Sequence, residues 1–300
     1  MLRLFVDNLL PVILTAAVGY ALAARVQVQA RSLARVAFLV FSPCLVYQIL
    51  FESRLPIGDM ARMAGFSFTV LLLLGGVAFL VARAMHLPRT LTAAAVLVVL
   101  LPNAGNIGLS VNYFAFGDPG LTQASLFFVS SSVLTYTVGV FIASLGKSGV
   151  RAALFGLPRV PTVWAVTAAL LMSHQGWEFP FPLARSIKLL SEACIPVFLV
   201  ILGIELQGVR WAGRARPLLA ATALRLVGGA VMAILVARVF GLEGPARQAG
   251  ILEAAMPSAV VTIILASEYE VESSFVTSVV FLTTLLCPFT LTPLLALLGA

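Results

Sequence analysis

About ten apolar segments follow one another along this 300-residue chain, and they have roughly the length that a membrane helix needs. They cover approximately residues 5–24, 33–51, 61–83, 90–116, 120–145, 160–175, 184–206, 217–240, 246–267 and 273–298. Hydrophobic residues make up 61% of the chain and charged residues 10%, whereas a soluble domain is closer to ~45–50% and ~25%. The sequence therefore predicts an all-α polytopic membrane protein with ten transmembrane helices. It excludes a soluble enzyme, a disordered chain and a nucleic-acid-binding module.

Basic residues are scattered singly between the apolar segments and give the chain a net charge of +7. Eleven Lys and Arg residues fall on one side of the predicted topology and seven on the other, while Arg225 lies within a segment. Because cytoplasmic loops are richer in Lys and Arg, the larger group predicts the cytoplasmic side, with both termini outside the cell membrane. The first segment is also compatible with a signal peptide, but Asp7, Asn8 and Pro11 interrupt it and favour a membrane helix.

The two halves of the chain share features at a nearly constant separation. The sequence Leu-Val-Ala-Arg at 80–83 recurs at 235–238. Three pairs of prolines are separated by a similar number of residues, namely Pro11 with Pro161, Pro43 with Pro196, and Pro102 with Pro257. We therefore expect two five-helix repeats, 1–146 and 160–300, joined by a short cytoplasmic linker at 147–159. An odd number of helices in each half inverts the second half in the membrane, and such repeats are typical of secondary transporters.

Two of the predicted helices are interrupted at equivalent places. Pro102 and two following glycines lie in the middle of the fourth segment, together with Asn103 and Asn106, and Pro257 followed by Ser258 lies in the ninth. Proline removes a backbone donor, so broken helices at this depth survive only beside a wet cavity or packed protein. We expect the two breaks to cross near the midplane. The second half-helices then begin there with free N–H groups, which favours an anion or a carboxylate.

Three ionisable residues lie within the predicted helices, where each is costly and is a functional candidate by default. Arg225 is expected either to neutralise an anionic substrate or to pair with Glu253. Glu192 and Glu253 are candidates for proton coupling, or they are exposed to a water-filled vestibule. The cysteines have no metal-ligand spacing, and no P-loop, GxSxG or HExxH pattern is present. The sequence therefore predicts neither an enzyme nor a bound metal or cofactor.

An ordered series of short motifs is similar to the auxin efflux carrier family, which includes the plant PIN-type carriers and bacterial relatives. The motifs are Arg35-Val36-Ala37-Phe38, Leu101-Pro102-Asn103, Ser186 to Ala193, Arg225-Leu226-Val227-Gly228, Ala254-Ala255-Met256-Pro257 and Ala266 to Val271. The resemblance implies an inverted 5+5 repeat with crossed helices 4 and 9. It also implies a scaffold of spans 1, 2, 6 and 7, a mobile transport domain of spans 3–5 and 8–10, and transport of organic anions. The family's binding element falls on Pro102 and Asn103, and its second crossover proline falls on Pro257.

The sequence departs from the plant carriers at several points. Ser258 follows the second crossover proline where plant carriers often have Gln, and Glu253 stands where they tend to have Gln. The long central loop of the plant proteins is reduced to about 146–160, and no acid occurs in 61–80. These differences argue against auxin itself as the substrate.

The leading hypothesis is a secondary transporter of small organic anions that works by alternating access, with Pro102, Asn103, Asn106, Pro257, Ser258 and Arg225 as the binding residues. A sodium-coupled symporter of the bile-acid type is the alternative within transport, because it shares the crossed-helix arrangement. A membrane protein that senses a substrate without net transport is an alternative from another class. The expected partners are the organic anion and the lipid bilayer, and a homodimer is left open.

Overall fold

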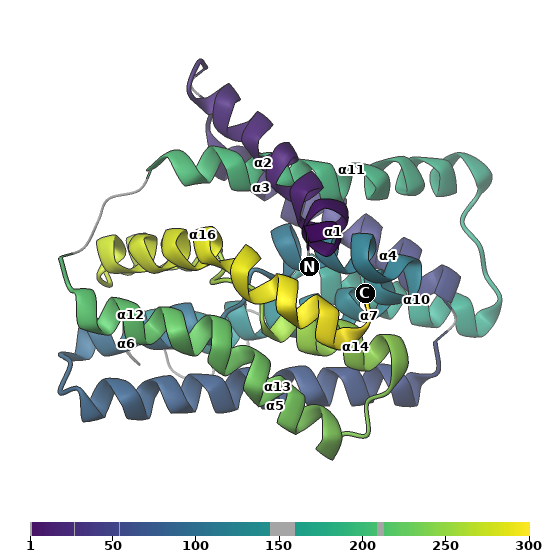
Figure 1. Ribbon diagram of the computed structural model, residues 1–300. Helices are drawn as coiled ribbons and strands as arrows, with labels where there is room; N and C mark the ends of the chain where they lie inside the picture. The colour runs from purple at the N-terminus through teal and green to yellow at the C-terminus, as the bar shows by residue number, and fades with distance from the viewer. Residues whose placement is uncertain (1, 27, 54, 145–159, 209–212) are drawn as a thin grey trace.

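Helices form nearly all of the secondary structure in the computed structural model, which describes residues 2–26, 28–53, 55–144, 160–208 and 213–300 (Figure 1). The first half contains α1 (Leu2–Leu4), η1 (Phe5–Leu9), α2 (Leu10–Ala23), α3 (Ala30–Val36), η2 (Ala37–Phe41), α4 (Ser42–Ser53), α5 (Ile57–Ala84), α6 (Arg89–Leu100), η3 (Ala104–Gly108), α7 (Leu109–Leu134), η4 (Thr135–Gly139) and α8 (Val140–Ala143). The second half contains α10 (Pro161–Gln175), α11 (Phe181–Glu205), η6 (Leu206–Gly208), α12 (Ala215–Ala223), η7 (Leu224–Gly228), α13 (Gly229–Val239), α14 (Gly244–Ala254), α15 (Val261–Glu268) and α16 (Ser273–Leu298). The linker expected at 147–159 lies outside the described residues.

Seven of the described helical stretches are long and apolar enough to cross a membrane. They are Leu2–Ala23, Ser32–Ser53, Ile57–Ala84, Ala104–Ala143, Phe181–Glu205, Ala215–Val239 and Ser273–Leu298. The prediction of an all-helical polytopic membrane protein is confirmed. The remaining three predicted spans correspond to shorter helices: α6 with the start of the long stretch, α10, and α14 with α15. These helices do not meet the length and composition expected of a membrane span.

Glycines allow a very close contact between α2 and α11. A Cβ atom added at Gly203 would lie 1.7 Å from the carbonyl oxygen of Ala16, and one added at Gly19 would lie 2.0 Å from the carbonyl oxygen of Val200. No side chain fits at either position, so the two backbones touch directly, as small residues permit in membrane helix pairs. The pair forms one edge of the molecule in Figure 1, and α4 packs against α10 beside it.

The surface and the interior have the polarity expected in lipid. Large apolar side chains such as Val239, Phe289 and Leu189 are more than two-thirds exposed. Ser110, Ser125 and other interior hydroxyl groups are buried and donate to the carbonyl oxygen four residues earlier in their own helices. Polar groups are therefore satisfied locally, while the apolar residues face outward, where a bilayer replaces water.

Three interruptions break the run of helices. The backbone leaves helical geometry between α6 and η3 and again between α14 and α15. The long stretch that contains α7 also has a non-helical residue, Gly117, with φ 62° and ψ −156°. The first two interruptions coincide with Pro102 and Pro257, as the sequence predicted, and they carry the candidate site.

Candidate functional site at the crossing of two broken helices

The two proline segments lie against each other as a short antiparallel pair. The N–H group of Asn103 donates to the carbonyl oxygen of Pro257 at 2.7 Å, and the N–H group of Ala259 donates to the carbonyl oxygen of Leu101 at 2.9 Å. Each break exposes backbone groups that a continuous helix would pair internally, and an unpaired group is costly inside a membrane. The two breaks satisfy these groups by pairing with each other, which fixes the crossing.

Ser258 replaces the hydrogen bond that Pro102 cannot make. In a continuous helix the carbonyl oxygen of Val98 would accept from residue 102, but proline has no N–H group. The Oγ of Ser258 donates to this carbonyl oxygen at 2.7 Å, and the N–H group of Ser258 donates to Oγ1 of Thr283 at 3.1 Å. Ser258 is fully buried. Its polar atoms are thus engaged with the protein and join the two breaks.

Arg225 binds the ends of both first half-helices. Its guanidinium donates to the carbonyl oxygen of Val99 and to that of Ala254. Continuous helices would pair these carbonyls with the N–H groups of Asn103 and Ser258, but both groups donate elsewhere. A cation at two helix C-termini satisfies the orphaned carbonyls and opposes the negative ends of the helix dipoles. Arg225 is fully buried and forms no ion pair with Glu253 among the described residues.

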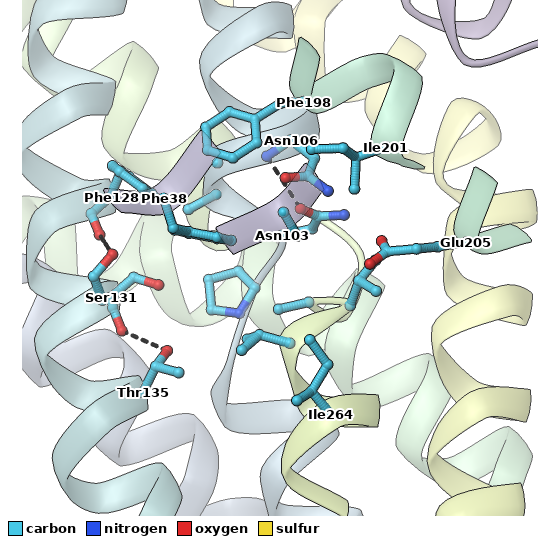
Figure 2. A pocket seen from close by; sticks show the side chains of 18 of the residues that line it. Phe38, Asn103, Asn106, Phe128, Ser131, Thr135, Phe198, Ile201, Glu205 and Ile264 are labelled. Carbon is cyan, nitrogen blue, oxygen red and sulfur yellow. Dashed lines mark hydrogen bonds between the residues drawn. The ribbon is translucent and has the colours of Figure 1, made fainter. Parts of the chain in front are cut away.

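Asn103 begins the second half-helix of the first break. Its Oδ1 accepts the N–H group of Asn106 at 3.2 Å, and its own carbonyl oxygen accepts the N–H group of Gly108 at 3.0 Å. This cap orients the side-chain amide, so Nδ2 points away from the helix start (Figure 2). Within the described part of the chain this buried Nδ2 has no hydrogen-bond partner. A buried donor without a partner inside a cavity wall is a candidate contact for a ligand.

A narrow pocket opens beside the crossing, and Figure 2 shows its lining. Its polar side chains are Asn103, Asn106, Ser131, Ser132, Thr135, Tyr136 and Glu205. Its aromatic wall consists of Phe38, Phe128 and Phe198, whose ring centroids lie 5.2–6.4 Å apart. The space between the walls is about 610 Å³ with the open mouth included, but the enclosed cavity is about 50 Å³. In this conformation the enclosed cavity has room for no more than a few water molecules.

Glu205 is a pocket residue that the sequence prediction missed. It ends α11, and Figure 2 shows its carboxyl group on the side of the pocket that Asn103 faces. Its Oε2 is buried without a hydrogen-bond partner among the described residues. The sequence carried a signal, because Glu205 directly follows the uninterrupted apolar run 195–204. It falls at the very end of the predicted segment 184–206, a position that by itself indicates no role.

Comparison with known proteins supports a transport function. Residues 150–295 match the family model described as membrane transport protein. An uncharacterised transporter of Methanothermobacter thermautotrophicus is 26% identical over 263 residues, covering 86% of this chain and 85% of that protein. Through these residues of its second half, the chain is related to the membrane transport protein family. It is a transporter and not an enzyme.

The names of two further relatives refer to malonate transport and to auxin efflux. A Rhizobium meliloti protein named as a candidate malonate transporter is 25% identical over 283 residues, which is 85% of this chain and 83% of that protein. Auxin efflux carrier component 1 of Arabidopsis thaliana is 29% identical over 134 residues, which is 43% of this chain and 21% of the plant protein. The predicted resemblance to the auxin efflux carriers is confirmed at the level of the family.

The two predicted coupling residues of this transporter lie apart from the pocket lining. Glu253 is fully buried, its Oε1 accepts from Nδ2 of Asn112 at 3.1 Å, and its Oε2 has no described partner. The carboxyl group lies against the backbone of Gly108, where an added Cβ would be 2.2 Å from Oε2. Glu192 is exposed on α11. The described residues contain no group of three or more acidic, His or Cys side chains that could hold a metal ion.

Proposed function

We propose that this family member is a secondary transporter of small organic anions and that the pocket beside the crossing is its binding site. The observation that carries the proposal is the unpartnered Nδ2 of Asn103 at the start of the helix that runs from Ala104. The first N–H groups of a helix lack intrahelical partners and form the positive end of the dipole. A carboxylate beside Asn103 would accept from Nδ2 and lie in the positive field of this helix start.

Arg225 and Ser258 serve the site indirectly in this proposal. Their donors are bonded to carbonyl oxygens of the broken helices, so they hold the crossing and leave the anion to Asn103 and Asn106. Pro102 and Pro257 open the backbone at which the site forms. We propose that Glu253, bonded to Asn112, fixes α14 against α7.

Ten spans in two inverted repeats, 1–146 and 160–300, remain our proposal for the architecture. The stretch Ala104–Ala143 has 40 residues, about 60 Å of helix and about twice the hydrocarbon thickness, so two passes joined at Gly117 account for it. Helix packing supports the repeat. The pairing of α2 with α11 corresponds to that of α10 with α4, and the pairing of α5 with α6 corresponds to that of α13 with α14. With both termini outside the cell membrane, the linker at 147–159 is cytoplasmic.

The pocket lies between the proposed scaffold and the proposed transport domain. Phe38, Phe198 and Glu205 belong to the proposed scaffold of spans 1, 2, 6 and 7, whereas Asn103 and Thr135 belong to the proposed transport domain of spans 3–5 and 8–10. The small cavity indicates that the two parts are nearly closed on each other. A shift of the transport domain along the scaffold would open the pocket and carry the anion across the membrane, as alternating access requires.

Transport by purified protein in liposomes tests the proposal. Counterflow with a panel of monocarboxylates and dicarboxylates identifies an anion that moves, and Asn103→Ala should lower its affinity by about 5–150-fold, equivalent to ~1–3 kcal/mol. Asn103→Asp should bind more weakly still, because it adds a negative charge and removes the donors. Asn8→Ala is the matched control, since the amide of Asn8 donates within its own helix.

Three outcomes would contradict the proposal. If Asn103→Asp binds the anion as tightly as the parent protein, the site is elsewhere. If flux stops without sodium, the chain is a symporter of the bile-acid type. If ligands raise the unfolding temperature but no flux occurs in either direction, the chain is a sensor.

A further inference from the structure

Two unpartnered polar atoms face one pocket. Nδ2 of Asn103 and Oε2 of Glu205 are both buried, neither has a hydrogen-bond partner among the described residues, and both side chains line the cavity in Figure 2. One is a donor, and the other belongs to an acid. An anion that binds beside Asn103 therefore enters a pocket that already contains a carboxyl group.

The surroundings of Glu205 offer little to compensate a negative charge. Among the residues that line the pocket, Tyr136 is the only other titratable group. On α3, Arg35 is exposed, and the side chain of Arg31 lies outside the described part of the chain. On α2, the carbonyl oxygen of Tyr20 accepts from Gln207, two residues beyond Glu205.

The ring of Tyr47 of α4 packs at a tilt against Phe179, just before α11 begins, and is therefore far along the helix from Glu205. The segments η2 and η3 contain no acidic or basic residue. A carboxylate of Glu205 and the carboxylate of a substrate would thus repel each other across a narrow cavity of low dielectric constant.

We propose that the pocket binds one proton together with each anion and that Glu205 carries this proton. The inference rests on the proposed function and deepens it. When the anion is bound, the carboxylic O–H of Glu205 donates to the substrate carboxylate, and Nδ2 of Asn103 donates to the same group. The proton comes from the water on the side to which the pocket is open and returns to water on the other side. The O–H bond of Glu205 forms as a hydronium ion on one side gives up a proton, and it breaks as a water molecule on the other side accepts that proton, so a monocarboxylate crosses with no net charge.

The experiment measures accumulation of a monocarboxylate in proteoliposomes whose membrane potential is held at zero with equal potassium and valinomycin. One proton per monoanion predicts accumulation on the alkaline side by about tenfold for each pH unit. A membrane potential without a pH gradient should drive no accumulation. Malonate, with two negative charges, should still respond to the potential, because one proton leaves one charge uncompensated.

Glu205→Gln is the deciding variant, because it keeps the shape of the side chain and a hydrogen-bond donor while it removes the exchangeable proton. We expect it to lose accumulation driven by the pH gradient and to respond to the membrane potential, while anion counterflow persists. Glu205→Asp should keep the dependence on the pH gradient, which guards against a folding defect. Glu178→Gln, at an exposed acid just before α11, is the matched control and should behave as the parent.

The outcomes separate this inference from the proposed function. Anion counterflow without any effect of the pH gradient would overturn the proton inference alone, as would full coupling in Glu205→Gln or accumulation that requires sodium. If no anion moves under any gradient, the transport proposal itself is wrong.

Discussion

The two breaks of the crossing are alike in sequence but differ in what they leave unpaired. At the second break, both polar groups of Ser258 are bonded, the N–H to Thr283 and the Oγ to Val98. At the first break, Oδ1 of Asn103 caps the helix, but Nδ2 of the same side chain has no described partner. One proline segment therefore closes the crossing, and the other keeps a donor free in the pocket.

This difference separates residues that hold the crossing together from the residue proposed to bind the anion. The hydrogen bonds of Arg225 and Ser258 replace those that the breaks remove, so their loss should appear first in stability. In the amide of Asn103 only Oδ1 is bonded and Nδ2 is free among the described residues, so the loss of this amide should lower anion affinity more than stability. Substitutions on the two sides of the crossing should therefore move different measurements.

Arg225→Gln should have the largest effect. A glutamine amide reaches fewer carbonyls than a guanidinium, so the substitution leaves buried ends of two half-helices unpaired. We expect a loss of about 3–5 kcal/mol in the free energy of unfolding, as for a broken buried charge interaction. Unfolding of the purified protein in detergent measures this loss. Arg238→Gln, at an exposed arginine on α13, is the matched control.

The same substitution also distinguishes two roles for the arginine. If Arg225 served mainly to neutralise Glu253, adding Glu253→Gln to Arg225→Gln would restore stability. Since the guanidinium bonds to the carbonyl oxygens of Val99 and Ala254, we expect no restoration. Recovery in the double variant would show that the carboxyl group is its partner.

The sequence predicted the positions of both breaks, because proline has a local and unavoidable effect on a helix. It also predicted the helical membrane class and the family. It could not predict which carbonyls Arg225 would satisfy, since that depends on how two segments some 155 residues apart pair in space. For the same reason, it named Ser258 as a binding residue, although its hydrogen bonds hold the backbone.

Glu205 shows a different limit of the sequence prediction. An acid at the end of a predicted helix is common at a membrane interface, so its pattern alone does not distinguish a solvated residue from a pocket residue. Only the packing of α11 beside the crossing brings its carboxyl group into the same cavity as Asn103. Glu192, for which the sequence left proton coupling or exposure to a vestibule open, is exposed on α11.

Ser258→Ala should have a smaller effect than Arg225→Gln, and mainly on stability. The substitution removes the donor that replaces the missing N–H group of Pro102, so the carbonyl oxygen of Val98 loses this partner. We expect a loss of about 1–3 kcal/mol in the free energy of unfolding, with anion affinity changed by less than about threefold. Ser258→Thr keeps the hydroxyl group but adds a methyl group at a fully buried position, so Ala is the cleaner test. A large fall in affinity at unchanged stability would assign Ser258 to the anion.

Asn106→Ala should have the smallest effect of the set and therefore sharpens the assignment of Asn103. The residue contributes its backbone N–H group to the cap on Asn103, and alanine retains that group. Its side chain lines the pocket, so a bound carboxylate would lose at most one amide contact. We expect the affinity to fall by about two- to tenfold, equivalent to ~0.5–1.5 kcal/mol, with little change in stability. Binding curves for Asn103→Ala and Asn106→Ala against the same anion measure the difference. A larger loss at Asn106 would move the centre of the site one helical turn further along the half-helix.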